Sequence, residues 1–340
     1  MLNNKQINVL KQLFDNLQDT EKDAFLKLVT QNNAGTTPDV TQKVVSVCPH
    51  CGGTHFVKNG STHAGSQRYL CPDCHKSFVE DSGTILYYTQ KSLRTWQKYI
   101  KCMMDKLPLR RCAAECDISL PTAFAWRHKI LDALQNMMNS VTLDGIVEAD
   151  ETFFRISYKG NHKKSSSFQM PRAAKKRGTA AKKRGISKEQ VCVPCGVNLD
   201  GKSIAHVANL GKPCVVDIQK VLGGRIEPET VFVTDALRAY QKISYDMDLE
   251  HIRIPRKKRV MGVFNIQTIN NYHSRLKELV LGVFHGVATK YLNNYLVYHN
   301  FVNYAKESRK EKQGILMNFI RETFCVVRTA DIPCRAAVPV

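Results

Sequence analysis

Two short apolar segments, each running into an aspartate, constrain most strongly how this 340-residue chain can fold. The first, IVEADETFF at 146–154, carries Asp150, and the second, TVFVTDALRAY at 230–240, carries Asp235. Both have the pattern of strands, and a helical pattern follows Asp235 at once. An acid at the carboxyl end of a buried strand lies where open α/β sheets place their functional sites. The two segments therefore predict an α/β fold with both aspartates at its site.

A third segment, NIQTINNYHSRLKEL at 265–279, has the spacing of an amphipathic helix. Its residues Asn270, Ser274 and Lys277 recur at intervals of four and three, so they share one stripe of that helix. Oxygen ligands from the two aspartates and this stripe suit divalent cations, which activate water and stabilise the leaving oxygen in phosphodiester chemistry. Taken alone, either aspartate is better explained as a helix N-cap or a turn residue. The joint pattern favours a metal site.

Alternation along the first strand separates its acids. Glu148 and Asp150 are predicted to face one side of the strand, and Glu151 the other. We therefore expect Glu151 not to share a metal ion with Asp150.

The charge of the chain indicates a polyanionic partner. Its 50 Lys and Arg outnumber its 30 Asp and Glu, which gives a net charge of +20. Such an excess is typical of proteins that bind nucleic acid. A membrane surface would attract the same charge, but no uninterrupted apolar run approaches the length of a spanning helix. The amphipathic, acid-containing N-terminus is unlike a secretory signal, so we expect a cytoplasmic protein.

Two Cys-X-X-Cys pairs predict a zinc site. CPHC at 48–51 and CPDC at 71–74 are separated by 19 residues, a spacing that lets four thiolates surround one Zn²⁺ tetrahedrally. Reduced free thiols or redox pairs are the alternative. We expect a zinc ribbon at 45–80, in which the metal stabilises a segment too short to have a core of its own. Its ligands would be Cys48, Cys51, Cys71 and Cys74.

Residues 88–137 have the pattern of a helix-turn-helix DNA-binding region. PLRRCAAECDIS at 108–119 predicts a helix and a tight turn, and LPTAFAWRHKILDALQNM at 120–137 predicts a second helix opened by Ser119 or Pro121. The alternative is a helical pair with a structural role only. The side chains expected to be exposed on the second helix and to contact DNA are Thr122, Arg127, His128 and Lys129.

The segment from Arg155 to Lys188 contains 12 Lys and Arg and no acid. Its composition is too polar to pack into a core, so we expect a basic loop at 155–188. Basic runs are often no more than solvated surface, but this one follows a candidate metal site, which favours contact with DNA phosphates. The candidate DNA-binding residues in it are Lys175, Lys176, Arg177, Lys182, Lys183 and Arg184.

The remaining segments complete the expected organisation. Residues 1–40 have helical spacing, which suits either a structural helical hairpin or a contact with a partner chain. The pattern at 190–211 predicts a β-hairpin that turns at Asp200-Gly201, in which Cys192 and Cys195 pack inside a strand. Helices are expected at 213–224 and, continuing the polar-striped helix, at 283–305. The stretch 311–340 carries no clear pattern and is taken as a C-terminal tail.

Hairpin strands, a crossover helix, an acid-ending strand and a polar-striped helix follow one another in the order of a ribonuclease-H-like fold. With a zinc ribbon and a helix-turn-helix in front, the chain resembles DDE-type bacterial insertion-sequence transposases. It is most similar to the group with an N-terminal zinc ribbon and with Glu or Asn at the third catalytic position, followed seven residues later by Lys. The match rests on EADETFF around Asp150, VTDALRAY around Asp235, and TINNYHSRLKEL with Asn270 and Lys277.

The resemblance extends from about Cys48 to Tyr304 and implies a ribonuclease-H-like transposase domain at 141–310. Such an enzyme binds transposon ends, cleaves DNA at them and joins the freed 3′-hydroxyl to target DNA. By resemblance, a dimer would act on double-stranded DNA at the bacterial nucleoid, with no membrane partner. Its catalytic residues would be Asp150, Asp235, Asn270 and Lys277, with Asp150 and Asp235 as ligands of Mg²⁺ or Mn²⁺.

An asparagine at the third catalytic position sets this chain apart from members that have Glu. The amide of Asn270 can ligate a metal, but it carries no charge and cannot act as a general base. Two alternatives to an active transposase stay open. One is a domesticated, inactive copy; the other is a zinc-ribbon, helix-turn-helix regulator whose C-terminal domain only dimerises or binds DNA.

Overall fold

The structure, a computed structural model, describes residues 45–63, 65–160, 185–255, 258, 260–303 and 307–340. All of these belong to one compact unit that spans 45–340, whereas residues 1–44 are assigned to a second unit. The N-terminal helical segment and most of the basic segment therefore lie outside the described residues. Among the helices within the described ranges, none is both long enough and apolar enough to cross a membrane.

Three short antiparallel strands follow the first cysteine pair. They are β1 (Val57–Ser61), β2 (Gln67–Leu70) and β3 (Ser77–Val79), hydrogen-bonded in the order β1-β2-β3. Their core is very small: Phe78 is buried with two of the cysteines, and the rings of Phe56 and Tyr69 pack against it. Apolar contacts this few do not stabilise a folded segment by themselves, and such a segment needs an additional cross-link, such as a bound metal.

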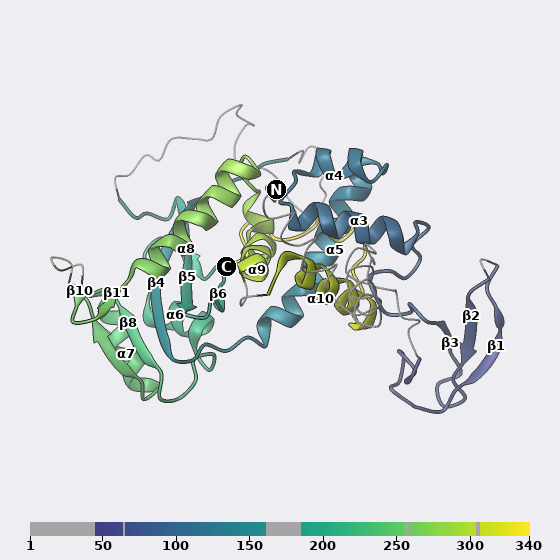
Figure 1. Ribbon diagram of the computed structural model, residues 1–340, viewed down its shortest axis with the longest axis horizontal. Coiled ribbons are helices and arrows are strands. Elements are labelled where there is room, and N and C mark those ends of the chain that lie inside the picture. The colour runs from purple at the N-terminus through teal and green to yellow at the C-terminus, as the bar shows by residue number, and fades with distance from the viewer. Residues whose placement is uncertain (1–44, 64, 161–184, 256–257, 259, 304–306) are drawn as a thin grey trace, which may run out of the picture. The chain divides into compact units, whose positions relative to one another are not determined.

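A group of helices follows these strands (Figure 1). Its members are α3 (Leu93–Met104), α4 (Leu109–Glu115), α5 (Leu120–Asn139) and, from the end of the chain, α10 (Arg309–Glu322). Ser119 caps α5 by accepting a hydrogen bond from the backbone N–H of Thr122, so the predicted start of this helix is confirmed. Trp96 of α3 stacks on Trp126 of α5 with a centroid separation of 3.8 Å.

Helix α10 corrects the expectation of a plain tail at 311–340. Ser308 and Glu311 form a capping box at its start, and Leu316, Met317 and Ile320 are buried in the core shared with α3 and α5. The charged run RKEKQ at 309–313 hides this short apolar face in the sequence. The face becomes recognisable only when the helices that cover it are known.

The central sheet contains both aspartate segments. Its strands are β4 (Ile146–Arg155), β5 (Gln190–Asn198), β6 (Ser203–Ala205), β8 (Val231–Thr234) and β9 (Glu250–Arg253). They lie in the order β6-β5-β4-β8-β9, and the short β7 (Asn209–Leu210) also pairs with β5. Strands β4, β5 and β6 are antiparallel, whereas β8 and β9 run parallel to β4. The predicted hairpin and the mixed α/β class are therefore confirmed.

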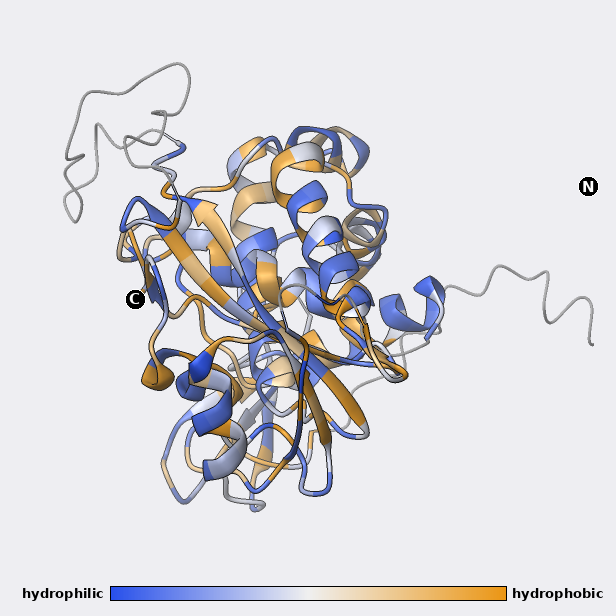
Figure 2. Ribbon diagram, turned by 90° about the vertical axis from the view of Figure 1, so that its left-hand side faces the viewer, coloured by the Kyte–Doolittle hydropathy of each residue, from blue (hydrophilic) through white to orange (hydrophobic). Residues whose placement is uncertain are grey.

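Helices cover both faces of this sheet, whose strands are largely apolar (Figure 2). On one face, α6 (Val215–Leu222) and α7 (Arg238–Asp246) pack in a core with Val147, Ala149 and Phe232. On the other, α8 (Gln267–Lys277) buries Ile269, Tyr272 and Leu276 against the residues of β5. In Figure 1, α8 runs alongside β4 and β5. The side chains of β4 therefore alternate between two helical layers.

The chain breaks its helix after α8, where the sequence predicts a continuous one. Glu278–Val283 form a π-helical turn, and His285 and Gly286 then take positive φ angles of 52° and 87°. A 3-10 turn at Thr289–Tyr291 leads into α9 (Leu292–Asn303). The break allows α9 to turn away from α8 and pack on α5 and β6.

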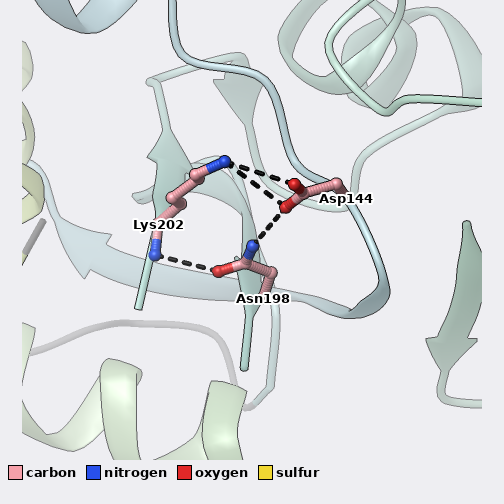
Figure 3. Close-up of polar contacts among 3 residues, drawn as sticks. All are labelled: Asp144, Asn198 and Lys202. Atoms are coloured by element: carbon pink, nitrogen blue, oxygen red, sulfur yellow. Dashed lines mark hydrogen bonds and ion pairs between the residues drawn. The ribbon is translucent and has the colours of Figure 1, made fainter. Parts of the chain in front are cut away.

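A polar clasp holds the β5–β6 turn against the start of β4 (Figure 3). Asp144 accepts hydrogen bonds from Asn198 Nδ2 at 2.7 Å and Lys202 Nζ at 3.3 Å. The backbone N–H of Lys202 donates to Asn198 Oδ1 at 2.9 Å. These bonds tie the hairpin register to the strand that carries Asp150.

A small hairpin of β10 (Val260–Met261) and β11 (Phe264–Asn265) lies just before α8.

Candidate active site

Asp150 and Asp235 occupy matching positions on neighbouring parallel strands. The last paired residues of β4 and β8 are Ala149 and Thr234, and the two aspartates are the next residues of each strand. Asp235 lies just past the end of β8, where its Oδ1 accepts a hydrogen bond from the backbone N–H of Leu237 at 2.9 Å. Strand β4 continues to Arg155 alongside β5, so the expected position at the end of a strand holds for Asp235 and not for Asp150. The two carboxylates lie together where the pairing of β4 with β8 ends.

Burial and a neighbouring charge both perturb Asp150. Burial raises the pKa of Asp150 to about 6, and the Asp235 carboxylate adds to the rise. The ammonium group of Lys277 acts on this pKa in the opposite direction. Two carboxylates held close together in a half-buried position repel each other, and a bound cation would relieve that repulsion.

Helix α8 turns one polar stripe toward Asp150. His273 is buried on this stripe, with Nδ1 3.9 Å from Asp150 Oδ2. Lys277, one turn later, is exposed, and Asn270, one turn earlier, is exposed as well. Burial, together with the charge of Lys277, lowers the pKa of His273 to about 4, so its ring is neutral at pH 7. The structure thus brings Asp150, Asp235, His273 and Lys277 to one place.

His273 is a residue of this site that the sequence analysis did not single out. Asn270, Ser274 and Lys277, which were expected to share one stripe of α8, are all exposed, and the Ser274 hydroxyl donates to the backbone oxygen of Asn270 at 3.0 Å. His273 lies beside that stripe, on the buried face of α8 with Ile269, Tyr272 and Leu276. The spacing of three and four residues from Asn270 and Lys277 was the available signal for this histidine.

Glu148 anchors α8 to the strand of Asp150, a role that the sequence did not reveal. Its side chain is buried, and its Oε2 accepts a hydrogen bond from the backbone N–H of Ile269 at 2.9 Å. Ile269 lies in the first turn of α8, where a carboxylate satisfies an unpaired N–H and interacts favourably with the helix dipole. Glu148 and Asp150 face the same helix, as the alternation predicts.

Glu151 faces away from this site. It lies on the opposite face of β4, beside the hydroxyl of Tyr240 on α7. Burial raises the pKa of Glu151 to about 7, and the charges of Asp150 and Asp235 contribute. Its position agrees with the expectation that it does not share a metal ion with Asp150.

The donor set suits a hard divalent cation. Two neighbouring carboxylates supply the oxygen ligands that Mg²⁺ and Mn²⁺ prefer, and burial together with the charge of Asp235 makes the ionised form of Asp150 less favourable than in water. The Nε2 atom of His273 is buried and has no hydrogen-bond partner within the described part of the chain. The residues present therefore fit a divalent ion held by Asp150 and Asp235.

The four cysteines of the segment 45–80 form a cluster that could hold zinc. Their Sγ atoms all lie within 4.8 Å of one another, with Cys48 and Cys74 at 3.7 Å and Cys51 and Cys71 at 3.6 Å. Tetrahedral Zn–S bonds of ~2.3 Å place sulfurs roughly 3.8 Å apart. The spacing in this cluster therefore fits one Zn²⁺.

The expected exposure of two residues on α5 is wrong. Arg127 is 3% exposed and His128 is 1% exposed. Half of the 20 residues of α5 are buried, because α3, α4, α9 and α10 pack around it. Arg127 therefore points into the protein, where its Nη2 donates to the backbone oxygen of Leu107 at 2.7 Å.

The other predicted DNA-binding residues divide into two groups. Thr122 and Lys129 are half-buried on α5 and keep part of their surface in solvent. The basic-segment candidates lie outside the described residues: Lys175, Lys176, Arg177, Lys182, Lys183 and Arg184.

Comparison with known proteins bears on this architecture directly. Residues 142–303 match the family model described as an ISXO2-like transposase domain. A Halobacterium salinarum (strain ATCC 700922 / JCM 11081 / NRC-1) protein, described as an uncharacterized protein in transposable element ISH50, is 27% identical over 256 residues. That alignment covers 73% of this chain and 82% of the relative. The matched region contains Asp150, Asp235 and the polar stripe of α8, and so residues 142–303 of this chain are similar to the ISXO2-like transposase domain.

Proposed function

We propose that this protein binds the ends of an insertion element, cleaves the DNA there and joins the freed 3′-hydroxyl to target DNA. The observation that carries the proposal is the pair of carboxylates, Asp150 and Asp235, which lie where the pairing of two parallel strands, β4 and β8, ends. The strand order β6-β5-β4-β8-β9, antiparallel on one side and parallel on the other, supports a ribonuclease-H-like fold for this domain.

The residues of the site divide the work of phosphodiester chemistry. Mg²⁺ or Mn²⁺ held by Asp150 and Asp235 would supply the Lewis acid that activates the attacking oxygen and stabilises the leaving one. Lys277, exposed beside this pair, would contact the phosphate next to the scissile bond. Asn270 would add a neutral amide oxygen or donate a hydrogen bond to the DNA. His273 would keep the Asp150 carboxylate turned toward α8.

The segments before the catalytic domain would bind the element's ends. A zinc ribbon at 45–80 and a helix-turn-helix made by α4 and α5 would supply this contact, with Thr122 and Lys129 on the partly exposed side of α5. The net charge of +20 favours association with DNA throughout the chain. We expect a dimer on double-stranded DNA, acting in the cytoplasm at the nucleoid.

Strand cleavage by the full-length protein tests the proposal. On DNA that carries the element's terminal repeats, with Mg²⁺ or Mn²⁺ and under single-turnover conditions, Asp150→Ala and Asp235→Ala should each lower the cleavage rate by at least about 1,000-fold. Binding to the same DNA, measured by fluorescence anisotropy, should persist. Asp246→Ala removes an acid of α7 that pairs with Lys242 at 3.4 Å, away from the sheet edge, and serves as the matched control.

Two results would contradict the proposal. If Asp150→Ala cleaves as fast as the wild type, the carboxylate pair does not carry the chemistry. If the wild type binds the ends but cleaves with neither metal, the protein is a DNA-binding regulator or an inactive copy.

A further inference from the structure

A cavity of about 710 Å³ lies between the helix-turn-helix region and the segment that connects α8 to α9. Its walls come from α4 and α5 on one side and from residues 284–295 on the other, with Lys159 and Pro333 at its margin. Neither Asp150 nor Asp235 lines it, so it is separate from the acidic site. Its volume falls in the range of roughly 300–1,000 Å³ that is typical of small-molecule sites.

The walls of the cavity combine aromatic rings with cations. The rings are those of Phe124, Phe284, Tyr291 and Tyr295, and the cations are Arg110, Arg127, Lys159 and Lys290. Among the described residues that line it, none is an acid. Lys159 Nζ donates to the backbone oxygens of residues 284–286, and Lys290 Nζ donates to that of Pro333, so these two ammonium groups already have acceptors. Flat π-faces beside positive charge suit a ligand that is both aromatic and anionic.

Arg127 gives the strongest indication that this cavity binds a ligand. It is 3% exposed, and its Nη2 is used by the backbone oxygen of Leu107 and by the Cys112 thiol at 3.2 Å. Its Nε and Nη1 atoms are buried and have no hydrogen-bond partner among the residues that the structure describes. An unpaired, buried guanidinium N–H is costly, and a ligand acceptor would remove that cost.

His128 adds a second unpaired polar atom at the same wall. The residue is 1% exposed, and its Nδ1 likewise has no partner within the described ranges. The ring lies 4.3 Å from that of Tyr291 and 4.5 Å from that of Phe124, so it is fixed between two aromatic walls. Arg127 itself lies over the ring of Phe284, with Cζ 5.2 Å from the centroid.

We propose that this cavity binds a single nucleotide, with its base against the aromatic rings that line it and its phosphate beside Arg110. Arg110 is exposed and also lines the cavity. Its guanidinium group can therefore contact a phosphate while it stays in contact with water. The Nε and Nη1 atoms of Arg127 are closed to solvent, so the side chain would turn toward the cavity on binding and donate from them to acceptors on the base edge. Guanine offers the O6 and N7 acceptors that arginine recognises most often, so we expect guanine to be preferred. The nucleotide comes either from a DNA strand, as an unstacked residue, or from free solution.

Calorimetric titration of the zinc-loaded, full-length protein with 2′-deoxyguanosine 5′-monophosphate (dGMP), without Mg²⁺ or Mn²⁺, tests this site. Saturable binding at one site per chain is expected. Deoxyguanosine and orthophosphate, titrated separately, should each bind at least about tenfold more weakly, because each supplies only part of the contact. If either binds as tightly as dGMP, or if dGMP does not saturate, the assignment is overturned. The absence of divalent metal separates this test from the cleavage test of the proposed function.

Neighbouring arginines provide a matched pair of variants. Arg110→Ala should weaken dGMP binding by about tenfold. Arg111 is also exposed but does not line the cavity, so Arg111→Ala should stay within about twofold. Equal effects of the two changes would overturn the proposal, since they would reflect surface charge only. Arg127→Met should abolish binding; near-ultraviolet circular dichroism shows whether it folds, and if it does not, the Arg110–Arg111 pair decides.

Displacement by DNA then identifies the source of the nucleotide. A short duplex with one unpaired guanosine nucleotide should displace dGMP, whereas the same duplex fully paired should not, if the cavity takes a nucleotide from DNA. Failure of both duplexes assigns the site to free nucleotides. Equal displacement by both duplexes overturns the pocket and points to competition at a basic surface.

Discussion

At the scale of single residues, Asp150 shows how a cation site can lower the stability of the folded protein. Its pKa is raised from 3.8 to about 6, first by burial and then by the charge of Asp235. A carboxyl whose pKa is higher in the folded protein than in the unfolded chain binds its proton more tightly when folded. It therefore lowers stability once pH rises above the unfolded value, and the cost is complete above the folded value.

Removing this charge should stabilise the protein. Without Mg²⁺ or Mn²⁺ at pH 8, Asp150→Asn is expected to raise the free energy of unfolding by about 1–3 kcal/mol, the scale set by ~1.4 kcal/mol for each pKa unit. The gain should shrink as pH falls below about 6 and vanish only below 3.8, where the wild-type carboxyl is protonated in both states. Urea unfolding at several pH values measures it.

Adding Mn²⁺ should reverse the order, since ions that bind only the folded wild type stabilise it by mass action. An Asp150→Asn protein less stable than the wild type in metal-free buffer at pH 8 would contradict this account of the site.

Asn270 is the proposed third catalytic residue, a position at which the resemblance to DDE-type transposases implies either Glu or Asn. Its exposed position one turn before His273 leaves room for a longer side chain. Asn270→Glu should retain or raise cleavage activity and tighten Mg²⁺ binding, because a third carboxylate adds charge to the ion's surroundings. Asn270→Gln, of the same length as Glu but neutral, is the control. Loss of cleavage in Asn270→Glu with intact DNA binding would show that the amide itself is required.

At the scale of elements, one buried carboxylate couples a helix to a strand. Glu148 on β4 accepts the N–H of Ile269 in the first turn of α8, and α8 carries Asn270, His273 and Lys277. The position of these three side chains relative to Asp150 therefore depends on this hydrogen bond together with the apolar packing of Ile269, Tyr272 and Leu276 on the sheet. Sequence order alone gives no hint of it, because 121 positions separate the two partners.

Glu148→Ala should break this coupling. Losing the acceptor leaves a buried N–H unsatisfied, and we expect the free energy of unfolding to fall by about 2–3 kcal/mol together with a fall in cleavage rate. Glu148→Gln keeps an acceptor oxygen and should lose less of both quantities. Chemical denaturation and single-turnover cleavage, measured on the same samples, give the two values. Wild-type stability in Glu148→Ala would mean that the hydrogen bond contributes nothing.

The cysteine cluster is a second element whose stability depends on one kind of bond. Its strands share a core of very few residues, so we expect about one Zn²⁺ per chain to hold 45–80 folded. Cys71→Ser should release the zinc and make this segment sensitive to protease, while 142–303 stay folded. Cys334→Ser, which changes an exposed cysteine outside the cluster, should keep the zinc. A zinc-free wild type, purified under reducing conditions and analysed by mass spectrometry, would contradict the assignment.

At the scale of the whole molecule, charge governs association with DNA. The net charge of +20 is spread over the chain, but 12 of its cations fall between Arg155 and Lys188 without an acid. Neutralising the six candidates between Lys175 and Arg184 to Gln should weaken DNA binding about equally for all sequences. It should also reduce the slope of log K against log salt, by ~0.9 for each DNA phosphate that the variant no longer neutralises. An unchanged slope would show that this segment does not bind DNA.

The sequence by itself determined the features that depend on local pattern. An alternating segment that carries Asp150 and a continuous apolar run that leads into Asp235 predicted two strands and their site. The spacing of four cysteines predicted a cluster, because each of these signals lies within a short stretch of sequence. Tertiary structure alone decided what depends on packing between distant segments. Arg127 is buried because four helices surround α5, His273 meets Asp150 because Glu148 fixes α8 on the sheet, and α10 is a helix because α3 and α5 cover its short apolar face. Burial is a property of the assembled neighbours, so no single segment encodes it.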